Sequence, residues 1–102
     1  MQNTITDITQ TITDILNEMI EMYEMPKVSI SPDTYLSASL GFTSIDMMHV
    51  LASVDMRFET HLPYDNLIMK NGEYISDLSV GEIAAFVEEN LQNASIEPKK
   101  MA

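Results

Sequence analysis

Four side chains of the types used in hydrolysis lie near one another in this sequence: Ser44, Asp46, His49 and His61. A serine nucleophile needs a histidine base within hydrogen-bond reach and an acid that orients the base. On a helix, Ser44 and His49 would lie about 140° apart around the axis, and His61 falls beyond the predicted helix end. No Gly-x-Ser-x-Gly turn surrounds the serine. We therefore predict no catalytic residue and place both histidines at the surface.

Metal ligands are scattered along the chain. There is no cysteine, and no loop has the Asp-x-Asp-x-Asp-Gly pattern of a calcium site. Glu18, Glu21 and Glu24 follow one another at helical spacing, which is typical of a solvated helix face. We therefore predict no metal site.

Ser44 is distinctive because of its position. It follows Leu40-Gly41-Phe42-Thr43 and stands at the start of a predicted helix. The first turn of a helix has unpaired N–H groups and a partial positive charge, so a phosphate attached to this serine would be favourably placed. Gly41 lets the backbone turn where a side chain would clash. The same residues also allow a simpler interpretation, in which Ser44 or Thr43 is an ordinary helix cap.

Three amphipathic segments must position this serine. The first spans 4–24, has apolar residues at steps of three and four, and ends before Pro26. The second begins at Thr43 or Ser44 and ends near residue 58 or 59. The third begins with Ser79-Val80-Gly81-Glu82, which has the spacing of a capping box.

The connections between these segments differ in length. A long loop spans 26–42, and we expect Tyr35, Leu36 and Leu40 to pin it onto the core. The segment 64–69 predicts one short turn or helix. Asn71-Gly72 is a turn signal, but its flanks do not alternate well enough to predict a hairpin.

This order of elements predicts an all-α fold. We expect a small bundle of three main helices plus one short helix, with the long loop between the first and second helices. Residues 1–91 would form the domain, and residues 92–102 a flexible C-terminal tail.

The composition limits the partners. The chain has 102 residues, 16 acidic and 5 basic, with a formal charge of −11. Such a surface repels nucleic acid and suits basic protein partners. No apolar run is long enough for a membrane span, and the N-terminus does not have the pattern of a signal peptide. We therefore expect a cytoplasmic protein, most simply a monomer.

The second helix has two apolar stripes. The residues predicted to face inward are Val50, Leu51, Val54 and Phe58. Ile45, Met48 and Ala52 are spaced three and four apart on a different stripe, which we expect at the surface because the inward stripe is already filled. The chain has nine methionines, a residue that also lines adaptable binding surfaces.

The segment Leu40-Gly41-Phe42-Thr43-Ser44-Ile45-Asp46 is similar to the phosphopantetheine attachment motif of acyl carrier proteins. That motif is commonly Leu-Gly, an apolar residue, and then Asp-Ser-Leu-Asp. The second helix and the following Leu62-Pro63 also resemble the family, and the segment 77–83 resembles the start of its last helix. The resemblance covers most of the chain, from the first helix to about Leu91.

This resemblance implies a carrier without catalytic activity. Ser44 would hold 4′-phosphopantetheine as a phosphodiester, and the thiol of that arm would hold an acyl group as a thioester. A phosphopantetheinyl transferase would install the arm, and acyl-loading, condensing or tailoring enzymes would use it. The second helix would be the recognition element, with these partner-recognition residues: Ile45, Asp46, Met48, His49, Ala52 and Asp55. Asp46 and Asp55 would meet basic partner patches.

Two residues depart from the family pattern. Thr43 stands where Asp is usual, and His49 stands where carriers of fatty acid biosynthesis usually have Glu. We therefore favour a free-standing carrier of a polyketide or other specialised pathway. A peptidyl or aminoacyl carrier is an alternative, although such carriers usually have a second glycine that Gly41-Phe42 does not supply. An acidic helical adaptor without an arm is the alternative from another class.

Overall fold

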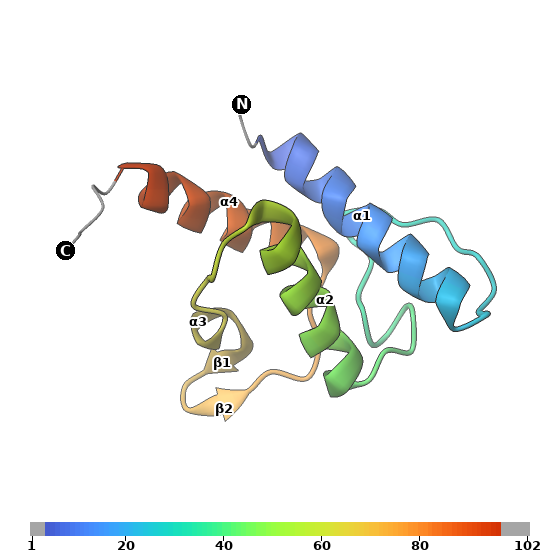
Figure 1. Cartoon of the computed structure of the whole chain (residues 1–102). Coiled ribbons are helices and arrows are strands. Elements are labelled where there is room, and N and C mark those ends of the chain that lie inside the picture. Colours follow the sequence, from blue (N-terminus) through green and yellow to red (C-terminus); the bar gives the residue numbers. More distant parts are fainter. Residues whose placement is uncertain (1–3, 97–102) are drawn as a thin grey trace.

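The computed structural model describes residues 4–96 as helices joined by loops, with one small hairpin (Figure 1). The main helices are α1 (Ile5–Met22), α2 (Ser44–Phe58) and α4 (Val80–Ile96). The short helix α3 (Asp65–Ile68) is followed by strands β1 (Met69–Lys70) and β2 (Glu73–Tyr74). The predicted all-α fold is confirmed, including the long loop between α1 and α2.

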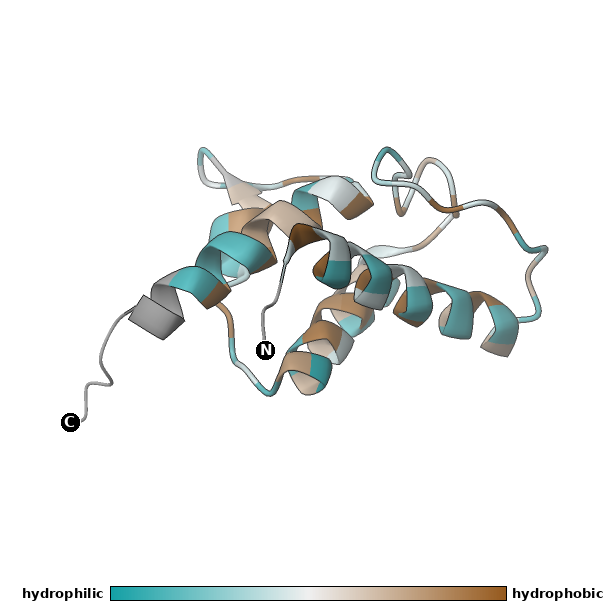
Figure 2. Ribbon diagram, turned by 90° about the horizontal axis from the view of Figure 1, so that it is seen from above, coloured by the Kyte–Doolittle hydropathy of each residue, from teal (hydrophilic) through white to brown (hydrophobic). Residues whose placement is uncertain are grey.

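Helix α1 supplies one wall of the core. It begins where the Thr4 hydroxyl accepts a hydrogen bond from the Asp7 N–H at 3.1 Å. Hydrophobic and hydrophilic residues alternate around the helices (Figure 2), and α1 packs its apolar side against both α2 and α4. The buried residues of α1 are Ile8, Ile12, Ile15, Leu16, Met19 and Ile20.

The loop between α1 and α2 contributes to the core. Leu36 and Leu40 are buried, as expected, and so is Phe42. The expectation for Tyr35 is wrong, since its side chain is 41% exposed. Tyr35 forms an extended bridge with Ser79. Neighbouring side chains of extended backbone point to opposite sides, so burying Leu36 turns Tyr35 outward.

Backbone hydrogen bonds tie this loop to the start of α4. The Leu36 N–H donates to the Leu78 carbonyl at 2.9 Å, and the Gly81 N–H donates to the Pro32 carbonyl at 2.8 Å. A β-carbon on Gly81 would lie 3.1 Å from that same oxygen, so glycine permits the close approach. The capping box of α4 is confirmed between Ser79 and Glu82.

The segment after α3 differs from the prediction. Met69 pairs with Tyr74 and Lys70 with Glu73 in a two-stranded antiparallel hairpin. The prediction against a hairpin is therefore wrong. Asn71 and Gly72 both have positive φ, 55° and 81°, which suits a tight hairpin turn. Strands of two residues are too short to show the alternation on which the prediction relied.

Helix α4 ends later than the predicted domain boundary at residue 91, since it continues to Ile96. Residues 97–102 of the predicted tail lie outside the described residues. None of the helices within residues 4–96 is long and apolar enough to cross a membrane.

Candidate functional site

The segment that leads into Ser44 is held by buried side chains. Leu40 and Phe42 are 5% and 3% exposed, so both are anchored in the core. The Phe42 N–H donates to the Leu36 carbonyl at 2.9 Å. Between the two anchors, Gly41 has a φ of 73°, a conformation that residues with a side chain rarely adopt. The backbone can therefore turn sharply and present Ser44 at the surface.

Thr43 caps the helix that begins at Ser44. Its hydroxyl accepts from the Asp46 N–H at 3.2 Å, and the Asp46 carboxylate accepts from the Thr43 N–H at 2.9 Å. This capping box satisfies N–H groups that would otherwise be unpaired at the helix start. Thr43 therefore performs the capping role that an aspartate could also perform here.

Tyr23 ties the end of α1 to the same helix start. Its hydroxyl donates to Asp46 Oδ1 at 2.9 Å, and its ring packs edge-on against Phe42 with 6.2 Å between ring centroids. The hydrogen bond from the Thr43 N–H lowers the pKa of the Asp46 carboxyl, and those from the hydroxyls of Tyr23 and Thr43 act in the same direction. Desolvation opposes this effect only in part. Asp46 is therefore ionised at neutral pH, where its charge suits the positive end of α2.

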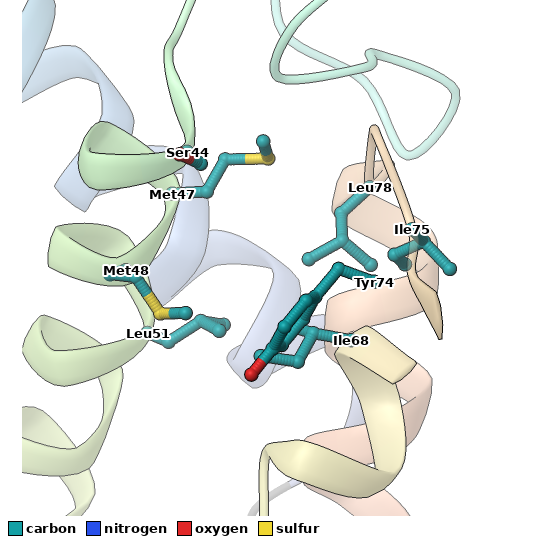
Figure 3. A pocket seen from close by; sticks show the side chains of 8 residues that line it. All are labelled: Ser44, Met47, Met48, Leu51, Ile68, Tyr74, Ile75 and Leu78. Atoms are coloured by element: carbon teal, nitrogen blue, oxygen red, sulfur yellow. The ribbon is translucent and has the colours of Figure 1, made fainter. Parts of the chain in front are cut away.

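The exposed side chain of Ser44 lies at the rim of an apolar cavity (Figure 3). The cavity has a volume of about 300 Å³ and lies between α2 on one side and α3, β2 and the segment before α4 on the other. Apart from the hydroxyls of Ser44 and Tyr74, the cavity is lined by apolar groups, which are the Tyr74 ring and the side chains of Met47, Met48, Leu51, Ile68, Ile75 and Leu78. An exposed hydroxyl and an apolar cavity therefore lie side by side.

No protein-family model, curated protein or solved structure matches this chain. The resemblance to acyl carrier proteins therefore rests on the sequence, on the motif around Ser44 and on the segments 62–63 and 77–83.

The second apolar stripe of α2 is exposed, as predicted. Ile45 is 78% and Met48 48% exposed, and Ala52 is also exposed. Met56, one turn further along the helix, is 78% exposed and extends the stripe. We call Ile45, Met48, Ala52 and Met56 the α2 stripe. The inward stripe of α2 is confirmed as well, with Val50, Leu51 and Val54 buried and Phe58 half-buried.

The remaining site residues are not gathered around Ser44. His49 is exposed on α2. Asp55 lies in the last turns of α2 with its side chain only 16% exposed, and it accepts a hydrogen bond of 2.8 Å from the Tyr64 hydroxyl. Burial raises the pKa of Tyr64 well above its ordinary value, and the hydrogen bond to Asp55 adds a smaller effect in the same direction. His61 Nδ1 lies 3.7 Å from the Asp55 carboxylate, and its side chain is 99% exposed.

The side chains considered for a hydrolytic site are therefore not brought together, because Ser44 lies at the start of α2 and His61 lies beyond its end. Within residues 4–96, no three histidine, aspartate or glutamate side chains gather in a way that could hold a metal ion.

Arg57, also on α2, forms a 2.7 Å ion pair with Glu18 of α1.

Sequence reasoning missed the contribution of Tyr23 and Tyr74 to this site. The hydrogen bond from Tyr23 to Asp46 joins positions far apart in the chain, and no local sequence pattern predicts it. For Tyr74, the available signal was the Asn71-Gly72 turn, which is typical of a hairpin whose ends lie together.

We expect Met48→Ala to change the free energy of unfolding by less than about 1 kcal/mol, because about half of the side chain is already in water. The matched variant Leu51→Ala, at a side chain 2% exposed on the same helix, should cost about 2–5 kcal/mol. Urea denaturation of both variants measures the difference. Equal losses would place Met48 in the core and contradict the exposed stripe.

Proposed function

We propose that this protein is an acyl carrier protein that bears 4′-phosphopantetheine on Ser44. The observation that carries the proposal is the position of the Ser44 hydroxyl, exposed at the N-terminus of α2 and at the rim of an apolar cavity of about 300 Å³. The N-terminus of α2 suits a phosphodiester, and the apolar cavity suits an acyl chain.

The phosphate end fits the start of α2. Ser44 is the first residue of the helix, so the N–H groups of its first turn favour an anionic group there. The carboxylate of Asp46 is nearby, but it accepts hydrogen bonds from Thr43 and Tyr23. These donors partly neutralise the repulsion that a free carboxylate would exert on a phosphate.

The acyl end fits the cavity. When bound, the arm would supply a terminal thiol that holds an acyl group as a thioester. Met47, Leu51 and Ile68 line the cavity with aliphatic surface, which favours an apolar chain by about 0.8 kcal/mol per buried methylene. The chain's own residues therefore bind and shield, and the chemistry on the acyl group belongs to separate enzymes.

In the modification reaction, the Ser44 oxygen would form the new bond to the phosphorus of the arm. Its proton would leave, and coenzyme A would release 3′,5′-ADP. The enzyme required is a phosphopantetheinyl transferase, and it must reach an exposed hydroxyl, as Ser44 offers.

The α2 stripe is the surface that we assign to partner enzymes. It begins one residue after Ser44 and continues along the same helix, so a partner that touches it would have the arm beside its own active site. Asp46 and Asp55 already have hydrogen-bond partners inside this chain. Apolar contact through Ile45 and Met56 therefore carries the docking, and His49 adds an exposed polar group that differs from the usual glutamate. We assign the carrier to a specialised pathway, such as polyketide biosynthesis, because of this difference and Thr43.

Transfer from a fluorophore-labelled coenzyme A tests the proposal. The protein is incubated with the labelled compound and a broad-specificity phosphopantetheinyl transferase, and the label is read in a denaturing gel. We expect a fluorescent band from the wild-type chain and none from a reaction without transferase. If several transferases leave the chain unlabelled, the carrier proposal fails. The acidic adaptor, which the exposed methionines of the α2 stripe also suit, would then be the better account.

A further inference from the structure

Tyr74 is both exposed to water and part of the cavity wall. Its side chain is 70% exposed, yet its ring lines the cavity beside Ser44. In Figure 3 the ring reaches from β2 toward α2, next to Ile68, with its hydroxyl end directed toward Leu51. Tyr74 therefore forms an outer wall of the cavity, at the end away from Ser44.

The backbone that carries this ring is held by hydrogen bonds, whereas most of the ring's surface is in water. Met69 pairs with Tyr74 across the hairpin, and the Ile75 N–H donates to the Ile68 carbonyl at 2.8 Å. The tight Asn71-Gly72 turn closes the hairpin. The ring projects from this frame with most of its surface in water, so a change of rotamer moves it without breaking any of these backbone bonds.

The cavity restricts what can lie behind the ring. Its walls offer apolar side chains, including the Tyr74 ring, and the two hydroxyls of Ser44 and Tyr74, so burial of a charged group would be costly. Its volume of about 300 Å³ can be compared with the ~150 Å³ of a dry cavity that binds benzene. The occupant is therefore small, uncharged and apolar.

We propose that Tyr74 is a specificity-determining residue whose ring sets the length of the longest straight aliphatic chain that the cavity accepts. The choice of an acyl chain as the natural occupant rests on the proposed function, but the effect of Tyr74 on chain length does not. Removing the ring opens the cavity at its far end, and a larger ring closes it further.

The test uses the unmodified full chain and neutral straight-chain alcohols from butanol to decanol. Binding is followed by the NMR signals of the Ile68, Leu51 and Leu78 methyl groups. We expect the wild-type affinity to rise about fourfold per added methylene until the chain fills the cavity, and then to level off. Tyr74→Ala should level off at a longer alcohol and Tyr74→Trp at a shorter one. Tyr74→Phe, which keeps the ring, should match the wild type.

Tyr35→Ala is the matched control, since it removes another exposed tyrosine that does not line the cavity. It should leave the chain-length limit unchanged. The proposal is overturned if the limit is the same in the alanine, tryptophan and wild-type proteins, or if no alcohol shifts these methyl signals. Labelling of Ser44 is measured on the same preparations. A chain that binds alcohols as expected but is never labelled contradicts the carrier function alone, and a labelled chain with an unchanged limit contradicts the role of Tyr74 alone.

Discussion

Leu36→Ala should lower the free energy of unfolding by about 2–5 kcal/mol, the range found when a buried leucine is truncated. Leu36 belongs to the long loop and is fully buried in the core. Its backbone also links two parts of the fold, because its N–H donates to the Leu78 carbonyl and its carbonyl accepts from the Phe42 N–H. The variant keeps these backbone bonds and removes only packing, so the loss in a urea denaturation curve measures how far the loop stabilises the core.

The control is Ile45→Ala, which truncates an aliphatic side chain that is 78% exposed. We expect a change within about 0.5 kcal/mol. A Leu36→Ala protein as stable as the control would mean that the loop is not part of the core. In that case the packing of Leu36 would not hold Phe42, or the segment that leads from Phe42 to Ser44, in place.

Asp77→Ala should cost about 1.5–3 kcal/mol, the range for hydrogen bonds to a charged group. The Asp77 carboxylate accepts from three backbone N–H groups, those of Ser37 at 2.7 Å, Leu78 at 2.9 Å and Ala38 at 3.0 Å. Two of these donors lie in the long loop and one just before α4, so the side chain joins the two segments. Its removal leaves donors without an acceptor in a partly buried place.

Asp77→Asn provides the graded comparison. Its amide oxygen can still accept from Ser37 and Leu78, whereas its NH2 group cannot accept from Ala38. We expect a loss smaller than that of Asp77→Ala in the same denaturation experiment. Asp33→Ala, at an exposed carboxylate of the same loop, should change little. If all three variants unfold like the wild type, the carboxylate does not hold the loop to α4.

Most of the fold could be predicted because its signals are local. The helical spacing from Ile8 to Ile20 fixed the buried face of α1. Cap residues marked the starts of α2 and α4, and the structure confirms both starts. The hairpin could not be predicted from alternation, because strands of two residues have no period to read. Tyr35 was misplaced because an aromatic side chain is compatible with either side of an extended segment, and the pairing with Ser79 decides which side it takes.

The site could be predicted only in part. The position of Ser44 at a helix start and the exposure of Ile45 and Met48 follow from spacing along one helix. The cavity could not be predicted from spacing along one helix, because its walls come from α2, α3, β2 and the segment before α4. Only the packed fold brings these elements together. The hydrogen bond from Tyr23 to Asp46 is of the same kind, since it joins the end of α1 to the start of α2.

The most direct measurement of the central claim is the intact mass of the wild-type and Ser44→Ala proteins after incubation with coenzyme A and a phosphopantetheinyl transferase. Ser44→Ala should fold normally, because Ser44 is exposed and Thr43 provides the cap of α2. We predict that the wild type gains the mass of one phosphopantetheine group and that Ser44→Ala gains nothing. A wild-type mass that stays unchanged with every transferase, or an equal gain in Ser44→Ala, would contradict the assignment of Ser44 as the attachment site.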